Sequence, residues 1–181
     1  MTYTHYSPHS MVPEKLLLWG EKSAACIERL CKETKRRPTI FYRGMSGISL
    51  ATATAMVYGM KAGNALNMLY CRKASEVSDF ADCHGLKNYE YSGEAWNPVS
   101  GPDETLFIFL DDFLSTGKSF GKGVERVLEF TETHPSLLRF EIVVAKEEQF
   151  WNSSSWTHSG TMTHDHLVGY RNIREHRAMR M

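Results

Sequence analysis

The sequence has no excess of charge of either sign. Lysine plus arginine number 21 and aspartate plus glutamate number 21, so the formal net charge is zero with neutral histidine. A chain without net charge lacks the long-range field that attracts nucleic acid or an anionic membrane surface. We therefore expect neither nucleic acid nor a membrane as a partner, and any anion-binding site has to be local.

Long apolar runs are also missing. The longest uninterrupted apolar stretch extends only from Leu106 to Leu110, whereas a membrane-spanning helix needs about 20 apolar residues. The first residues, MTYTHYSPHS, have neither the basic start nor the apolar middle of a signal peptide. These features predict a soluble, cytoplasmic protein.

Closely spaced cysteines are absent too. Zinc and dithiol sites use Cys-x-x-Cys pairs, and none occurs among Cys26, Cys31, Cys71 and Cys83. We therefore expect free thiols. His164 and His166 flank Asp165, but alternate residues without a third, distant ligand seldom make a metal site.

The composition that remains is that of one folded domain. The chain has 181 residues, of which 42% are hydrophobic, with only 6 prolines and 13 glycines. A chain of this length buries roughly 70% of its unfolded surface without disulfides or metal. No repeat or linker interrupts it, so we expect a single domain over residues 1–181.

Hydrophobic periodicity predicts strands that alternate with helices. Apolar residues at three-to-four spacing indicate helices, and short runs rich in β-branched and aromatic residues indicate strands. The predicted order is a helix at 13–37, a strand at 38–43, a helix at 48–61, a strand at 65–71, a polar segment at 72–104, a strand at 105–112, a helix at 115–134 and a strand at 137–146. This alternation is typical of an α/β, doubly wound, mainly parallel sheet with helices on both faces.

Ligands of such sheets bind at the carboxyl ends of the strands. Charged residues follow the predicted strands at Arg43-Gly44, Arg72-Lys73, Asp111-Asp112 and Lys146. Each of these has an ordinary structural alternative, such as a strand exit, a solvated charge pair or a helix cap. Four such features at successive strand ends would nevertheless converge in space if the sheet is parallel.

Asp111 and Asp112 end the most apolar predicted strand, and a hydroxyl-rich glycine turn follows them. A helix start offers unpaired N–H groups, so this turn, with the hydroxyls of Ser115, Thr116 and Ser119, suits a phosphate monoester. The two carboxylates suit ribose hydroxyls and Mg²⁺, which prefers oxygen ligands. A sugar phosphate satisfies both halves.

The segment IFLDDFLSTGKS, residues 108–119, resembles the phosphoribosyl-pyrophosphate motif of type I phosphoribosyltransferases. Phe109 and Phe113 are bulkier than the usual aliphatic residues of that motif. A nucleotide-triphosphate P-loop is the competing interpretation, because Gly117-Lys118-Ser119 spells its last three letters. That loop needs a glycine five residues before Gly117, where this chain has Asp112.

The resemblance implies roles for residues along the chain. Asp111 and Asp112 would hold the ribose and Mg²⁺, and Lys73 and Arg72 would lie beside the pyrophosphate. The 5-phosphate would bind Ser115, Thr116, Gly117, Lys118 and Ser119, and the pyrophosphate loop would be Arg43, Gly44, Met45, Ser46 and Gly47. Residues 74–88 would form a flexible loop, and the chain would divide into an N-terminal helical extension (1–37), a core (38–146) and a hood (147–181).

The acceptor stays open at this point. Ser115 stands where the family's 6-oxopurine enzymes have a third acid, whereas Lys146 matches the place of their base-adjacent lysine. Phe150, Trp151 and Trp156 lie where the family builds its hood, and they are either a stacking face for a flat base or ordinary aromatics.

Two hypotheses follow from these residues and the resemblance. The first is a Mg²⁺-dependent phosphoribosyltransferase, whose partners are phosphoribosyl pyrophosphate and a nitrogenous base or nucleotide, with a second copy of the chain as a candidate partner. The second is a non-catalytic, regulatory protein of the same fold that binds phosphoribosyl pyrophosphate or a nucleotide. A pyrophosphate-release assay over a panel of bases distinguishes them.

Overall fold

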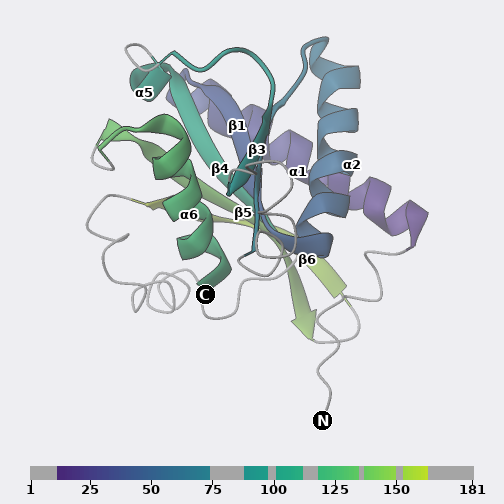
Figure 1. The fold of residues 1–181 in the computed structure, drawn as a ribbon. Coiled ribbons are helices and arrows are strands. Elements are labelled where there is room, and N and C mark those ends of the chain that lie inside the picture. The colour runs from purple at the N-terminus through teal and green to yellow at the C-terminus, as the bar shows by residue number, and fades with distance from the viewer. Residues whose placement is uncertain are drawn as a thin grey trace.

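A six-stranded sheet forms the centre of the molecule (Figure 1). The computed structural model describes residues 12–73, 88–97, 101–111, 118–134, 137–149 and 153–162, with only the backbone described at 45, 46, 118 and from 144 onward. The strands are β1 (Arg37–Tyr42), β2 (Asn67–Cys71), β3 (Tyr89–Ser92), β4 (Thr105–Asp111), β5 (Arg139–Gln149) and β6 (Ser153–Met162). Their order across the sheet is β3-β2-β1-β4-β5-β6.

The four central strands are parallel and the two outer strands are antiparallel to their neighbours. β1 pairs with β2 and β4, and β4 pairs with β5, all in parallel. β3 and β6 add to the edges in the opposite direction. All seven residues of β4 are buried, as expected for the middle of a parallel sheet covered on both faces.

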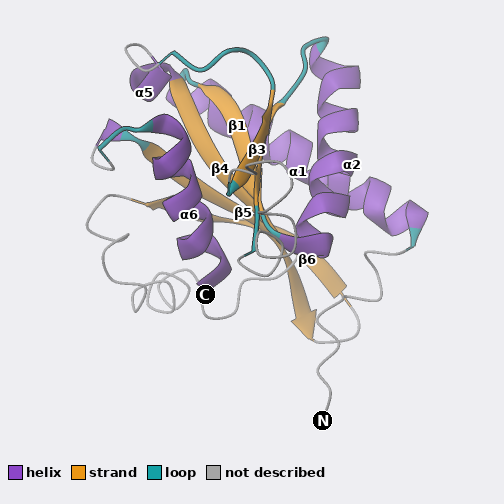
Figure 2. Ribbon diagram, viewed as in Figure 1, coloured by secondary structure: helices purple, strands orange, loops and turns teal. Residues whose placement is uncertain are grey.

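Helices cover both faces of this sheet (Figure 2). α6 (Lys118–Thr131) lies on the near face, while α1 (Pro13–Thr34) passes behind the sheet beside α2 (Gly44–Ala62), and α5 (Gly101–Glu104) is a single turn before β4. The predicted α/β class, with a mainly parallel sheet and helices on both faces, is therefore confirmed. Among the described helices, none is long and apolar enough to cross a membrane.

Each face has its own core. The α6 face is mainly aromatic, and Phe41 lies at its centre, with ring centroids 5.3 Å from Phe109 and 6.1 Å from Phe120. The α1–α2 face is mainly aliphatic and includes the buried Trp19 and Ile27 of α1. Because successive strand residues point to opposite faces, each β1 and β4 residue contributes to one core only.

α1 and α2 cross at very close range. A Cβ built on Gly20 of α1 would lie 2.9 Å from the backbone carbon and oxygen of Ala53. One turn further along, the hydroxyls of Ser23 and Thr54 form a buried hydrogen bond of 2.5 Å. Glycine at position 20 is therefore what allows the two helix backbones to approach.

Several predicted boundaries were wrong. β3 lies inside the segment expected to be polar loop (72–104), and β6 is a strand that the sequence analysis did not predict. α1 ends at Thr34 because Lys35 takes a left-handed conformation with φ 59°. α2 begins at Gly44, four residues earlier than expected. The three cysteines that the structure describes, Cys26, Cys31 and Cys71, are free, as predicted.

Candidate functional site

The carboxyl ends of β2, β1 and β4 form one continuous row. Tyr42 pairs with Tyr70, and Phe41 pairs with Phe109. Continuing this register places Arg43 level with Cys71 on one side and with Asp111 on the other. The sheet therefore brings together three groups of site residues that the sequence separates widely: those that follow β1, β2 and β4.

Lys73 lies directly against the first residue of α2. Gly44 has a φ of +71°, and a Cβ built on it would lie 2.9 Å from the Nζ atom and 3.1 Å from the Cε atom of Lys73. The amino end of α2 carries unpaired N–H groups and a partial positive charge. An ammonium group beside such a helix start concentrates positive charge at the exit of β1, which is the charge that an anion requires.

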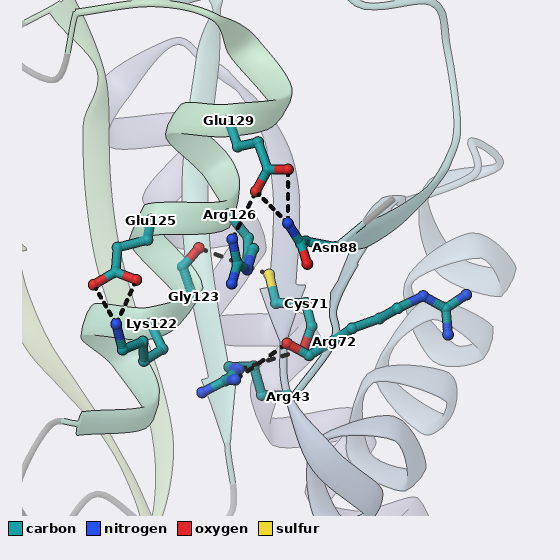
Figure 3. A network of polar contacts seen from close by, with 9 residues as sticks. All are labelled: Arg43, Cys71, Arg72, Asn88, Lys122, Gly123, Glu125, Arg126 and Glu129. Carbon is teal, nitrogen blue, oxygen red and sulfur yellow. Dashed lines mark hydrogen bonds and ion pairs between the residues drawn. The ribbon is translucent and has the colours of Figure 1, made fainter. Parts of the chain in front are cut away.

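Arg43 uses its guanidinium group on the backbone of β2 (Figure 3). Its Nε–H donates to the carbonyl oxygen of Cys71 at 3.4 Å, and its Nη2 donates to that of Arg72 at 3.1 Å. Arg43 thus ties the exit of β1 to the exit of β2.

Arg72 points away from this pair of strand ends. Its guanidinium forms an ion pair with Glu90 of β3 and lies 5.9 Å from the centroid of the Tyr70 ring. Its backbone N–H donates to the carbonyl oxygen of Asn88 at 2.9 Å. The basic pair therefore separates, with Lys73 against the start of α2 and Arg72 against β3.

Asp111 ends β4 and is only 7% exposed. A carboxylate at this depth requires compensation from donors or a cation, and oxygen is the donor atom that Mg²⁺ prefers. Asp111 therefore fits a place in a magnesium site, for which Asp112, outside the described residues, is the adjacent second carboxylate. Among the described residues, no cluster of three or more histidine, cysteine or acidic side chains could by itself hold a metal ion.

α6 packs tightly over the ends of β1 and β2. A Cβ built on Gly123 would lie 2.9 Å from the Phe41 ring, and the thiol of Cys71 contacts the Gly123 carbonyl oxygen at 3.7 Å. Burial raises the pKa of the Cys71 thiol to about 12. Since the thiolate is the nucleophilic form, Cys71 serves here as packing.

Hydrogen bonds connect α6 to the residue before β3 (Figure 3). The Asn88 amide donates to both Glu129 carboxylate oxygens, at 3.0 and 3.3 Å, and Arg126 pairs with the same carboxylate at 2.7 Å. Asn88 thus joins three elements, because its carbonyl also accepts the Arg72 N–H. The sequence prediction missed Asn88, Glu90 and Glu129, and the alternating pattern of Tyr89, Glu90 and Tyr91 was the available signal for β3.

Other predicted site residues are only partly described. Gly47 packs against the end of β1, since a Cβ built on it would lie 3.3 Å from the Cβ of Tyr42. Ser119 is exposed on α6. Lys146 was expected to end its strand, but β5 continues to Gln149 and residue 146 pairs with Ser155 of β6. Only the backbone is described for Met45, Ser46 and Lys118. Ser115, Thr116, Gly117, Phe150, Trp151 and the expected loop residues 74–87 lie outside the described residues.

Comparison with solved structures finds chains of similar fold. No protein-family profile and no curated protein sequence matches the chain. The chain is similar to an orotate phosphoribosyltransferase of Francisella tularensis, with 14% sequence identity and a TM-score of 0.49. The match covers 77% of this chain and 58% of the other, so the chain spans less than two thirds of that protein.

Proposed function

We propose that this protein is a Mg²⁺-dependent phosphoribosyltransferase. It transfers the 5-phosphoribosyl group from phosphoribosyl pyrophosphate to a nitrogenous base or related small acceptor and releases pyrophosphate. The observation that carries the proposal is the register of β2, β1 and β4, which places Lys73, Gly44 and Asp111 at one edge of the sheet. The motif at 108–119 supplies the substrate class.

The order of the strands assigns the basic and the acidic residues of the proposed site to different strand ends. Lys73 and the start of α2 are positive and lie at the exits of β2 and β1, where the pyrophosphate would bind. The acidic residue Asp111 ends β4, and together with Asp112 it would bind the ribose hydroxyls. Residues 115–119 would bind the 5-phosphate, and of these Lys118 and Ser119 begin α6.

The reaction requires stabilisation of a developing anion more than a nucleophilic side chain. As the bond between ribose and pyrophosphate breaks, negative charge grows on the departing pyrophosphate, and fixed positive groups lower the barrier most at that moment. Lys73 would supply such a group. Mg²⁺ held by Asp111 and Asp112 would neutralise further charge on the phosphate oxygens. Lys146, Phe150 and Trp151 are the proposed contacts to the base.

Isothermal titration with phosphoribosyl pyrophosphate and Mg²⁺, followed by a pyrophosphate-release assay over a panel of bases, tests this function. We expect phosphoribosyl pyrophosphate to bind in the presence of Mg²⁺ and pyrophosphate to be released with at least one base. Lys73→Ala should weaken binding modestly and reduce turnover more, because its charge matters most as the pyrophosphate departs. Lys122→Ala, which removes a lysine paired with Glu125 on α6, is the matched control and should change neither.

The outcomes distinguish the two hypotheses. Absence of binding with Mg²⁺ present would overturn the proposal. Binding without release for every base would instead favour a regulatory protein that binds phosphoribosyl pyrophosphate and does not turn it over.

A further inference from the structure

Arg72, the residue before Lys73, has contacts through its backbone N–H, its carbonyl oxygen and its guanidinium. The Arg72 N–H donates to Asn88, its carbonyl oxygen accepts from Arg43, and its guanidinium pairs with Glu90. These three partners come from different parts of the chain, namely the exit of β1, the turn into β3 and β3 itself. The peptide from which Lys73 extends is therefore fixed before any ligand arrives.

Arg43 is the partner that connects this peptide to the proposed anion site. It immediately precedes Gly44, against which the Lys73 ammonium lies, and its Nε and Nη2 donate to two successive carbonyl oxygens of β2. The Nε and Nη2 donors of Arg43 are therefore hydrogen-bonded to the backbone of the protein rather than directed at a ligand. A guanidinium with two donors in one plane suits two neighbouring acceptors better than a single point charge does.

We propose that Arg43 is a positioning residue, which fixes the exit of β2 so that the Lys73 ammonium lies over the start of α2. Arg43 acts on the anion through Lys73 rather than as a ligand of the pyrophosphate. This inference deepens the proposed function, on which it rests for the identity of the anion, and it replaces the direct pyrophosphate contact that the sequence suggested for Arg43.

A measurement without ligand tests the positioning step alone. Amide hydrogen exchange is compared at Arg72 and at Ile40 in the middle of β1 for wild type, Arg43→Ala, Arg43→Gln and Lys122→Ala. Loss of hydrogen bonds from a charged donor should accelerate exchange at Arg72 by roughly tenfold or more relative to Ile40 in Arg43→Ala. Arg43→Gln keeps an amide donor where Nε stood, so it should show a smaller increase, and Lys122→Ala should show none. Unchanged relative exchange in Arg43→Ala would overturn the positioning role.

A double-mutant cycle tests whether Arg43 acts through Lys73. Pyrophosphate with Mg²⁺ is titrated into wild type, Arg43→Ala, Lys73→Ala and the double variant. We expect each single substitution to weaken binding by about tenfold, as for loss of one charge-assisted hydrogen bond, and the double variant to bind no worse than Lys73→Ala. Losses that multiply would mean that Arg43 contacts the anion independently, which would overturn the proposal.

Two further results complete the test. Arg43→Gln should recover part of the lost affinity although it carries no charge, and no recovery would count against positioning. If wild-type protein binds neither pyrophosphate nor phosphoribosyl pyrophosphate, the proposed function fails, while the exchange experiment still decides whether Arg43 fixes the β2 exit. Thermal melts of all variants verify that the fold is intact.

Discussion

Gly44→Ala should damage both the stability of α2 and the binding of anions. Gly44 has a φ of +71°, and its added Cβ would lie 2.9 Å from the Lys73 Nζ. Placing an L-residue with a side chain in the left-handed region costs roughly 1–2 kcal/mol. The contact with Lys73 adds little to this figure, because the end of a lysine side chain moves readily, but that movement takes the ammonium off the helix start.

Gly63→Ala is the matched control at the other end of the same helix. Gly63 also has a left-handed φ, of +70°, and nothing lies within 4 Å of the Cβ that alanine would add. Both variants should therefore lose roughly 1–2 kcal/mol in urea unfolding. In a chain of this size that loss corresponds to a Tm about 2–8 °C lower.

Anion binding should separate the two variants. Titration of pyrophosphate with Mg²⁺ should show wild-type affinity for Gly63→Ala and weaker binding for Gly44→Ala. Full stability of both variants would refute the argument from backbone conformation. Equal affinity of both variants, with wild-type binding intact, would refute the argument that the Lys73 ammonium must lie over Gly44.

Three further predictions concern other parts of the structure. Asp111→Asn with Asp112→Asn should weaken Mg²⁺-dependent binding of phosphoribosyl pyrophosphate without lowering the urea midpoint, and unchanged affinity in titration would contradict the assignment of these acids. Burial raises the pKa of the Cys71 thiol to about 12, so the unfolded chain loses this proton at a lower pH than the folded protein does. The free energy of unfolding should therefore fall by about 1.4 kcal/mol per pH unit as the pH rises from about 9 towards 12. Urea unfolding of wild type and Cys71→Ser at pH 8 and pH 10.5 should show a shallower decline in the variant. Gly20→Ala should destabilise by a net amount of about 0–2 kcal/mol, because forcing α1 from the Ala53 backbone costs about 1–3 kcal/mol against a gain in helix propensity of about 1 kcal/mol. A rise in Tm would show that the two helices separate freely.

The sequence predicted the central elements well because their signals are local. β4 is apolar at nearly every position and proved to be buried throughout, and α1 shows the spacing of an amphipathic helix. The parallel pairing of β1 with β2, and of β4 with β5, follows from the helices α2 and α6 that connect these strands. In a parallel sheet the carboxyl ends of the strands lie at one edge, and the register, continued by one or two residues, brings Arg43 level with Cys71 and Asp111.

The edge strands and the division of the basic pair could not be predicted as easily. β6 has a polar sequence, SSSWTHSGTM, and it exists because it pairs with β5, which is a tertiary effect that overrides local propensity. β3 has only four residues and follows a long polar segment. Arg72 and Lys73 look equivalent in sequence, and their separation depends on Glu90, whose position requires knowledge of β3.

The strand order, rather than the chain order, decides which strand ends are neighbours at the site. β1 lies between β2 and β4, so the backbone exits of β2 and β4 are two strand spacings apart, roughly 10 Å. The Lys73 side chain spans one of these spacings, because its ammonium lies against Gly44 at the exit of β1. Arg43, which directly follows β1, donates to the carbonyl oxygens of Cys71 and Arg72. The strand exit that receives the Lys73 ammonium therefore also holds the peptide from which that side chain extends.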